Sequence, residues 1–242
     1  MSPILALEKI SKRFGAVVVA NGIDLVLTEG EALGVIGPNG AGKTTLFNIA
    51  AGTLAPDTGR VIFAGADVTR LTPERRCRLG LARSFQIPQP FSGMTVFENL
   101  VVSAAFGSGR RERDVYAECA NVLTRCGLLD KANRQAGALT LLDRKRLELA
   151  RALATRPRVL LLDEVAGGLT EHECAELVAL IRQLHRSGVS IVWIEHVVHA
   201  LVAVVDRLVV LHGGGFIAAG DPQTVIRSPA VAEVYMGIPT EA

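Results

Sequence analysis

The segment GPNGAGKTT, at residues 37–45, constrains the fold of this chain more than any other feature. It follows a short apolar run at 32–36 and leads into a helical stretch at 43–51. The letters match G-x-x-x-x-G-K-[ST], in which glycines let backbone N–H groups surround phosphate oxygens and the helix N-terminus adds positive potential. A glycine turn before a helix is the plainer alternative. The strand–loop–helix order favours a nucleotide-binding loop instead.

All nine residues of this loop are candidates for nucleotide contacts. Lys43 can reach the β- and γ-phosphates, and the hydroxyl of Thr44 can bind Mg²⁺. The predicted cofactors are therefore ATP and Mg²⁺. The residues expected around the phosphates are Gly37, Pro38, Asn39, Gly40, Ala41, Gly42, Lys43, Thr44 and Thr45.

A second motif, VLLLDE at 159–164, ends an apolar run with two acids. Ligands of open α/β sheets bind at the carboxyl ends of the strands, which is where both acids fall. Asp163 is placed to hold the metal, directly or through water, and Glu164 to orient and deprotonate an attacking water. An acidic strand end that caps the next helix is the alternative, and the phosphate loop upstream favours the catalytic interpretation.

Short apolar runs alternate with helical stretches along the chain. Continuous apolar runs are typical of strands buried on both faces of a parallel sheet. Such runs lie at 32–36, 158–163 and 190–194. Helices are expected after them, at 43–51, 172–187 and 197–204. The segment VVVANGIDLVLTEG predicts antiparallel strands joined by an Asn-Gly turn at 21–22.

Residues 73–155 are mainly helical in character, and they predict a helical insertion in the α/β core. The predicted fold class is α/β, a P-loop NTPase with a parallel core sheet, an N-terminal antiparallel β flank and an inserted helical subdomain. One domain is expected over 1–242, with the nucleotide-binding core at 1–85 and 156–242 and the helical subdomain at 86–155.

Composition excludes several classes of protein. The 242 residues are 49% hydrophobic and 21% charged, as in a folded protein with a buried core. A net charge of +2 gives no reason to expect a nucleic-acid partner. No apolar run approaches the ~18 residues of a membrane span, the N-terminus lacks a signal-peptide pattern, and the four cysteines form no C-x-x-C pair. We therefore expect a cytoplasmic protein with reduced thiols and no membrane anchor of its own.

Three motifs together resemble a known family. With the phosphate loop, the Asp-Glu pair and a histidine after the next strand in WIEHVV, the chain resembles an ATP-binding-cassette (ABC) ATPase over nearly its whole length. The resemblance implies that His196 contacts the γ-phosphate, that Gln86 in ARSFQIPQPF links the metal to a transmembrane partner, and that Phe14 in SKRFGA stacks on adenine. Burial of Phe14 in the core, and plain surface positions for Gln86 and His196, are the alternatives. The expected catalytic residues are thus Glu164, His196 and Gln86, and the expected metal-binding residues are Thr44, Gln86 and Asp163.

Other segments are similar to the ATP-binding subunits of bacterial branched-chain amino-acid importers. They are GKTTLFNIAAGTLAPDTGRVIFAGADVT, RLGLARSFQIPQPFSGMTVFENL and the tail SPAVAEVYMG, although lipid-export ATPases share a comparable tail. The similarity implies an energy-coupling ATPase at the inner face of the cell membrane. Its partners would be a second ABC ATPase subunit, transmembrane permease subunits and, indirectly, a solute-binding protein.

Two rival functions stay open. A soluble ABC ATPase of DNA repair or translation usually has a coiled coil, a zinc site or duplicated cassettes, and this sequence has no such pattern. A regulatory protein that binds ATP without hydrolysing it is the other rival, and Glu164 and His196 argue against it.

The segment after Gln86 predicts a contact with a membrane subunit. Two prolines and a glycine give residues 88–93 a hinge-like character. Ile87, Phe91 and Met94 are apolar and follow no evident core period. An ordinary core turn is the alternative.

The segment LTLLD, at 139–143, stands where the family carries an L-S-x-G-Q signature, which closes the nucleotide site of the partner subunit. Thr140 keeps the hydroxyl, Leu142 replaces the glycine and Asp143 replaces the glutamine, while Thr140 and Asp143 also match a capping box. Leu142 is expected to add a branched side chain where backbone nears phosphate, and Asp143 to add negative charge there. The resemblance therefore favours a heterodimer whose other subunit has an intact signature. Thr170, where Asn or Asp is usual, is a further departure.

Overall fold

A six-stranded sheet forms the centre of the fold, and the computed structural model describes residues 2–236 of the chain. Its strand order is β10-β9-β3-β8-β7-β6, parallel from β9 to β6, with β10 antiparallel at one edge. The strands are β3 (Ala32–Ile36), β6 (Leu81–Arg83), β7 (Val159–Asp163), β8 (Ser190–Ile194), β9 (Arg207–His212) and β10 (Gly215–Gly220). Every residue of β3, β7 and β8 is buried, which explains their continuous apolar letters. The three predicted strands are confirmed to within one residue.

A second, antiparallel sheet has the order β2-β1-β4-β5. Its strands are β1 (Pro3–Phe14), β2 (Val17–Thr28), β4 (Thr58–Phe63) and β5 (Ala66–Asp67). The antiparallel flank is confirmed, but the Asn-Gly turn at 21–22 is wrong. The turn lies at Gly15, and Asn21 and Gly22 form a bulge inside β2, because Ile10 pairs with Ile23 whereas Lys12 pairs with Ala20. The positive φ of Gly22, 62°, serves this bulge.

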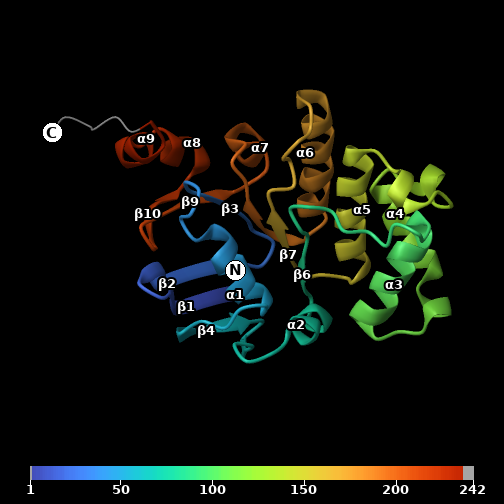
Figure 1. The fold of residues 1–242 in the computed structure, drawn as a ribbon, viewed down its shortest axis with the longest axis horizontal. Coiled ribbons are helices and arrows are strands. Elements are labelled where there is room, and N and C mark those ends of the chain that lie inside the picture. The colour runs from blue at the N-terminus through green and yellow to red at the C-terminus, as the bar shows by residue number, and fades with distance from the viewer. Residues whose placement is uncertain (1, 237–242) are drawn as a thin grey trace.

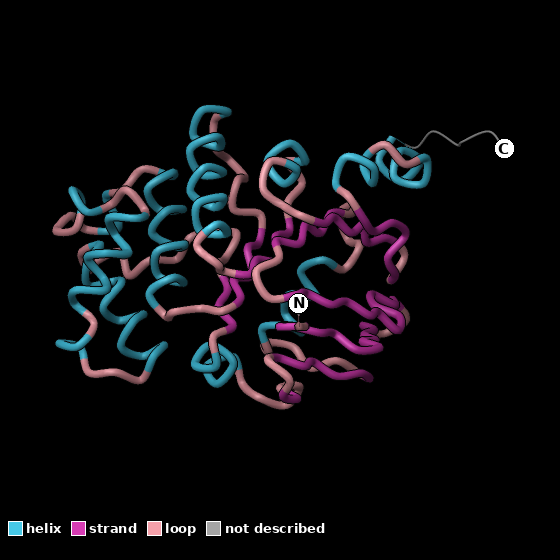
Figure 2. The backbone as a smooth tube through the Cα atoms, turned by 180° about the vertical axis from the view of Figure 1, so that it is seen from behind, coloured by secondary structure: helices cyan, strands magenta, loops and turns pink. Residues whose placement is uncertain are grey.

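The helices are distributed unevenly around the two sheets. Figure 1 shows α3, α4 and α5 gathered on one side of the molecule, away from the antiparallel sheet, and the reverse view in Figure 2 agrees. The α-helices are α1 (Lys43–Ala51), α2 (Pro73–Leu79), α3 (Val96–Ser108), α4 (Tyr116–Arg125), α5 (Leu141–Ala154), α6 (Glu171–Arg186), α7 (Val198–Val202), α8 (Pro222–Ile226) and α9 (Pro229–Met236). Short 3₁₀ turns lie at Glu112–Asp114, Leu129–Lys131 and Ala136–Ala138. The helices predicted at 43–51, 172–187 and 197–204 correspond to α1, α6 and α7.

Two hydrophobic cores lie on opposite faces of the six-stranded sheet. One contains Leu46 and Phe47 of α1 together with residues of β3, β7 and the antiparallel sheet. The other joins α3, α4, α5 and α6 to β8, where Trp193 is fully buried. The helical region is therefore packed onto the sheet through one continuous core. Within residues 2–236, no helix is long and apolar enough to cross a membrane.

A buried arginine joins α2 to the end of α1. Nη1 of Arg76 donates to the carbonyl oxygens of Ile49 and Ala50, each at 2.6 Å. Its Nη2 donates to the carbonyl of Thr69 at 2.8 Å. The last turn of a helix leaves its carbonyls without intrahelical donors, so Arg76 supplies what the end of α1 lacks. This contact fixes the helix that begins at the phosphate loop.

The substitution Arg76→Met keeps apolar volume but removes these hydrogen bonds; the Ile49 carbonyl keeps the N–H of Gly52, at 3.2 Å, as its other donor. We expect it to lower the free energy of unfolding by about 2–4 kcal/mol, because hydrogen bonds to a charged group are strong and unsatisfied buried acceptors add to the loss. Denaturant unfolding followed by circular dichroism measures the change. Arg75→Met, at an exposed position of the same helix, is the control and should change stability by less than about 0.5 kcal/mol. Equal losses from the two variants would contradict the role of Arg76.

Candidate active site

The phosphate loop connects β3 to α1 with little room for side chains. A Cβ at Gly37 would lie 2.3 Å from the carbonyl oxygen of Leu211. At Gly42 it would lie 2.7 Å from the carbonyl oxygen of Val19, and Gly42 also has a φ of 101°. Glycine is therefore required at both positions. No side chain caps the start of α1, so its first N–H groups remain available to an anion.

Lys43 lies inside this loop rather than in solvent. Its side chain is 6% exposed, and its ammonium donates to the carbonyl oxygens of Gly37 at 2.7 Å and Pro38 at 3.1 Å. Burial lowers the pKa of Lys43, while the charges of Glu164 and Asp163 act to raise it. The loop thus holds a cation within the electrostatic reach of both strand-end acids.

Asp163 ends β7 and Glu164 follows it, and side chains of two separate segments reach Glu164. Nε2 of Gln86 donates to Oε2 of Glu164 at 2.6 Å, and Nδ1 of His196 lies 3.8 Å from the same oxygen. Glu164 has a φ of 46°, a strained conformation for a residue with a side chain. Asp163 is buried, and its Oδ2 accepts a hydrogen bond from Nη2 of Arg83 at 2.6 Å. The structure therefore brings Gln86, Glu164 and His196 together at the end of β7.

Three charged residues that the sequence analysis missed surround this cluster. Arg83 ends β6, Lys145 lies on α5 and donates to the carbonyl of Gln86 at 2.8 Å, and Glu195 follows β8. Glu195 is fully buried, and burial together with the charge of Glu164 raises its pKa to about 8. It is therefore mostly neutral at pH 7. A charged residue directly after a continuously apolar strand was the signal that could have identified Glu195, whereas the strand that Arg83 ends has only three residues and gives no such signal.

Phe14 and Thr44 lie where a ligand can reach them. The Phe14 side chain is 50% exposed at the end of β1, so its burial in the core is excluded. Lys12 lies beside the ring, with Nζ 5.6 Å from the centroid. Thr44 is exposed in the first turn of α1. In the described part of the chain, no group of three or more His, Cys, Asp or Glu side chains forms a complete metal site. The hydroxyl, carboxylate and amide oxygens of Thr44, Asp163 and Gln86 are nevertheless the donor types that Mg²⁺ takes beside nucleotide phosphates.

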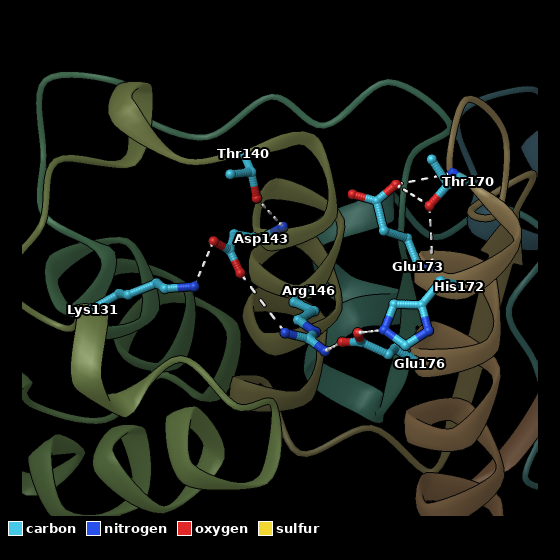
Figure 3. A network of polar contacts seen from close by, with 8 residues as sticks. All are labelled: Lys131, Thr140, Asp143, Arg146, Thr170, His172, Glu173 and Glu176. Carbon is cyan, nitrogen blue, oxygen red and sulfur yellow. Dashed lines mark hydrogen bonds and ion pairs between the residues drawn. The ribbon is translucent and has the colours of Figure 1, made fainter.

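The start of α5 in the signature region corrects one part of the sequence analysis (Figure 3). Oγ1 of Thr140 accepts from the N–H of Asp143 at 3.3 Å and caps α5, as predicted. The reciprocal half of the capping box is wrong, because the Asp143 carboxylate accepts from Nζ of Lys131 at 2.7 Å and lies 3.8 Å from Nη1 of Arg146. The Leu142 side chain packs in the core of this chain. Two cations, Lys131 and Arg146, thus lie beside the negative charge that Asp143 adds.

The same ion pairs continue from α5 to α6. Arg146 pairs with Glu176, and Nε2 of His172 lies 3.0 Å from Oε1 of Glu176 (Figure 3). Thr170 caps α6 in a complete capping box with Glu173. Threonine at position 170 is therefore, like the usual Asn or Asp, a favourable N-cap residue for α6.

A glycine-lined phosphate loop, two strand-end acids, an amide and a histidine on one edge of a parallel sheet define a P-loop ATPase. The family model described as ABC transporter matches residues 20–167. BraF of Pseudomonas aeruginosa, a high-affinity branched-chain amino acid transport ATP-binding protein, is 36% identical over 250 residues, which cover 97% of this chain and 98% of BraF. LivG of Escherichia coli strain K12, described in the same words, gives the same identity and the same coverage.

Among solved structures, the ADP conformation of MJ1267, an ATP-binding cassette of an ABC transporter, superposes with a TM-score of 0.91 at 30% identity. The match covers 98% of this chain and 100% of that one. The chain therefore belongs to the ABC transporter family and is an ATP-binding ATPase of that family. The predicted fold class and family are confirmed.

Proposed function

We propose that this chain is the energy-coupling ATPase subunit of an importer for branched-chain or other hydrophobic amino acids. The observation that carries the proposal is the 36% identity to BraF and LivG over nearly the full length of both chains. The assembled cluster around Glu164 supports hydrolysis rather than nucleotide binding alone. We place the protein on the inner face of the cell membrane, bound to separate permease subunits that receive substrate from a solute-binding protein.

ATP would be bound by the phosphate loop and by the end of β1. The phosphate loop, 37–45, surrounds the phosphates, with Lys43 exchanging its two carbonyl partners for phosphate oxygens. The half-exposed ring of Phe14 offers a platform for adenine. Mg²⁺ would be held by Thr44, Asp163 and Gln86, and it supplies neutralisation of charge on the phosphates when bound.

Hydrolysis requires a positioned water, and Glu164 is the residue that we assign to it. Its carboxylate can take the proton of the water as the water attacks the γ-phosphorus. The amide of Gln86, 2.6 Å away, holds one carboxylate oxygen and leaves the other free for the water. His196, whose Nδ1 lies 3.8 Å from the same oxygen of Glu164, is the residue that we assign to the γ-phosphate.

A groove beside Gln86 is the surface that we assign to a permease subunit. It has a volume of about 410 Å³ and lies between α2, β6, α3 and α5. Phe85, Phe91 and Phe106 line it, and each is about half exposed or more. Exposed aromatic surface of this extent is typical of an interaction site. Gln86 would thus connect the groove to Glu164.

A second ABC ATPase subunit would complete each nucleotide site with its signature segment. In this chain that segment departs from the family's L-S-x-G-Q pattern at Leu142, which stands for the glycine, and at Asp143, which stands for the glutamine. Both side chains are buried within this chain, so neither offers the glycine or glutamine of the family's motif to a partner's nucleotide. We therefore infer a heterodimer in which the partner contributes the stronger signature.

The catalytic assignment predicts different effects for two substitutions. Glu164→Gln should reduce ATP turnover by about 10²–10⁴-fold with nucleotide affinity retained, because only the proton acceptor is lost. Lys43→Ala should weaken nucleotide binding itself, because a phosphate countercharge is gone. Turnover measured in the assembled complex and equilibrium binding of a fluorescent ATP analogue separate the two. Normal turnover in Glu164→Gln would overturn the assignment.

The importer proposal predicts coupling that depends on Gln86. In the complex reconstituted in vesicles, a branched-chain amino acid with its binding protein should stimulate ATP turnover of the wild type. Gln86→Ala should abolish this stimulation, while nucleotide affinity of the isolated chain changes by less than about twofold. Gln183→Ala, at an exposed position of α6, is the control and should be stimulated normally. Absence of any membrane subunit on purification would refute the transport role, and stimulation of Gln86→Ala would refute the role of Gln86.

The heterodimer proposal predicts unequal sites. The catalytic Glu is changed to Gln in one subunit at a time, and steady-state ATP turnover of the complex is measured. The change at Glu164 should remove most turnover, because the site built on Lys43 and Glu164 receives the partner's signature. The corresponding change in the partner should remove little. Equal losses would show that LTLLD serves as well as an intact signature.

A further inference from the structure

Arg83 contacts two elements of the active site, although it belongs to none of the motifs of the sequence analysis. It ends β6 and its side chain is 11% exposed. One guanidinium nitrogen, Nη2, donates to Oδ2 of Asp163 at 2.6 Å, and the other, Nη1, donates to Oδ1 of Asn48 at 2.6 Å. One side chain thus joins the last residue of β7 to α1, the helix that starts at the phosphate loop.

Two aromatic rings restrict the guanidinium further. Its central carbon lies 5.9 Å from the centroid of Phe47 and 5.4 Å from that of Phe85. The backbone beneath it is held as well, because Arg83 pairs with Leu161 in the parallel ladder between β6 and β7. A guanidinium is a planar fork, so two hydrogen bonds and two rings leave it one orientation.

The geometry points to Arg83 as the positioning residue of the Asp163 carboxylate for Mg²⁺. Arg83 occupies Oδ2, whereas no hydrogen bond within residues 2–236 reaches Oδ1, so the carboxylate is turned with one oxygen free. Carboxylates that bind metals are generally oriented by such a partner, whose removal weakens metal binding. The inference rests on the proposed role of Asp163 toward Mg²⁺, and it goes further by assigning a residue that touches neither nucleotide nor metal.

The test separates metal binding from nucleotide binding. The full chain is loaded with a fluorescent, non-hydrolysable ATP analogue, first in EDTA and then over a titration of free Mg²⁺. Arg83→Gln should raise the half-saturating Mg²⁺ concentration about 10- to 100-fold, the usual effect of losing such a partner. Affinity for the analogue in EDTA should stay within about twofold of the wild type, because the phosphate loop is intact. Arg83→Lys keeps the positive charge but not the planar guanidinium. Its half-saturating Mg²⁺ concentration should lie between those of the wild type and Arg83→Gln.

A surface pair provides the matched control. Arg158 pairs with Glu29 at 3.1 Å, both side chains being about half exposed, and Arg158→Gln should leave the Mg²⁺ titration unchanged. If Arg83→Gln weakens binding equally in EDTA and in Mg²⁺, Arg83 acts on the structure in general and the inference is overturned.

Asp163→Asn distinguishes the inference from the proposal beneath it. A Mg²⁺ titration that is shifted in Asp163→Asn but not in Arg83→Gln overturns the inference and leaves the role of Asp163 standing. A titration that is unchanged in Asp163→Asn overturns both. Shifts in both variants, with wild-type affinity in EDTA, support Arg83 as the positioning residue.

Discussion

The need to balance two carboxylates at the end of one buried strand governs the arrangement of the whole site. Asp163 and Glu164 follow four buried apolar residues, where an isolated negative charge is costly. The compensating cations come from three elements: Arg83 from β6, Lys43 from α1 and Lys145 from α5. A further carboxylate in this region, Glu195, stays mostly neutral because its pKa is about 8. The strand order therefore also brings these cations close to the carboxylates of Asp163 and Glu164, which offsets the cost of burying negative charge.

Helix α5 connects this charge balance to the exposed groove. Lys145, Glu148 and Arg151 recur every three residues along one side of the helix, facing the segment that follows β6. Lys145 donates to the carbonyl of Gln86, and Arg151 donates to that of Gln89 at 2.9 Å and to Glu148 at 3.0 Å. The backbone around Gln86 is thus held by the same helix that starts at the signature segment. Helix α5 is therefore linked through Lys145 to Gln86, whose side-chain amide lies 2.6 Å from Glu164.

The sequence predicted those parts of the structure that local physics determines. Strands buried on both faces, such as β3 and β8, are apolar throughout, so the apolar runs in the sequence predicted where these strands begin and end. The Asn-Gly pair at 21–22 misled because its positive φ fits a bulge as well as a turn, and only the pairing of β1 decides between them. Strand β6 has three residues, too few for a periodicity. The roles of Arg83 and Lys145 depend on partners 80 and 59 residues away, and no local pattern encodes such pairings.

The signature segment departs from the family motif in sequence but still forms the capped start of a helix. Asp143 is neutralised by Lys131, twelve positions earlier in a 3₁₀ turn, and by Arg146 one turn later. Leu142 adds its side chain to the core, where burial of a leucine contributes about 1.5–3 kcal/mol. Neither change therefore destabilises the start of α5, and Thr140 still caps it. The two residues that differ from the family pattern, Leu142 and Asp143, are both buried within this chain. Any functional consequence must consequently arise at the contact with a second subunit, since within this chain the substitutions are compensated.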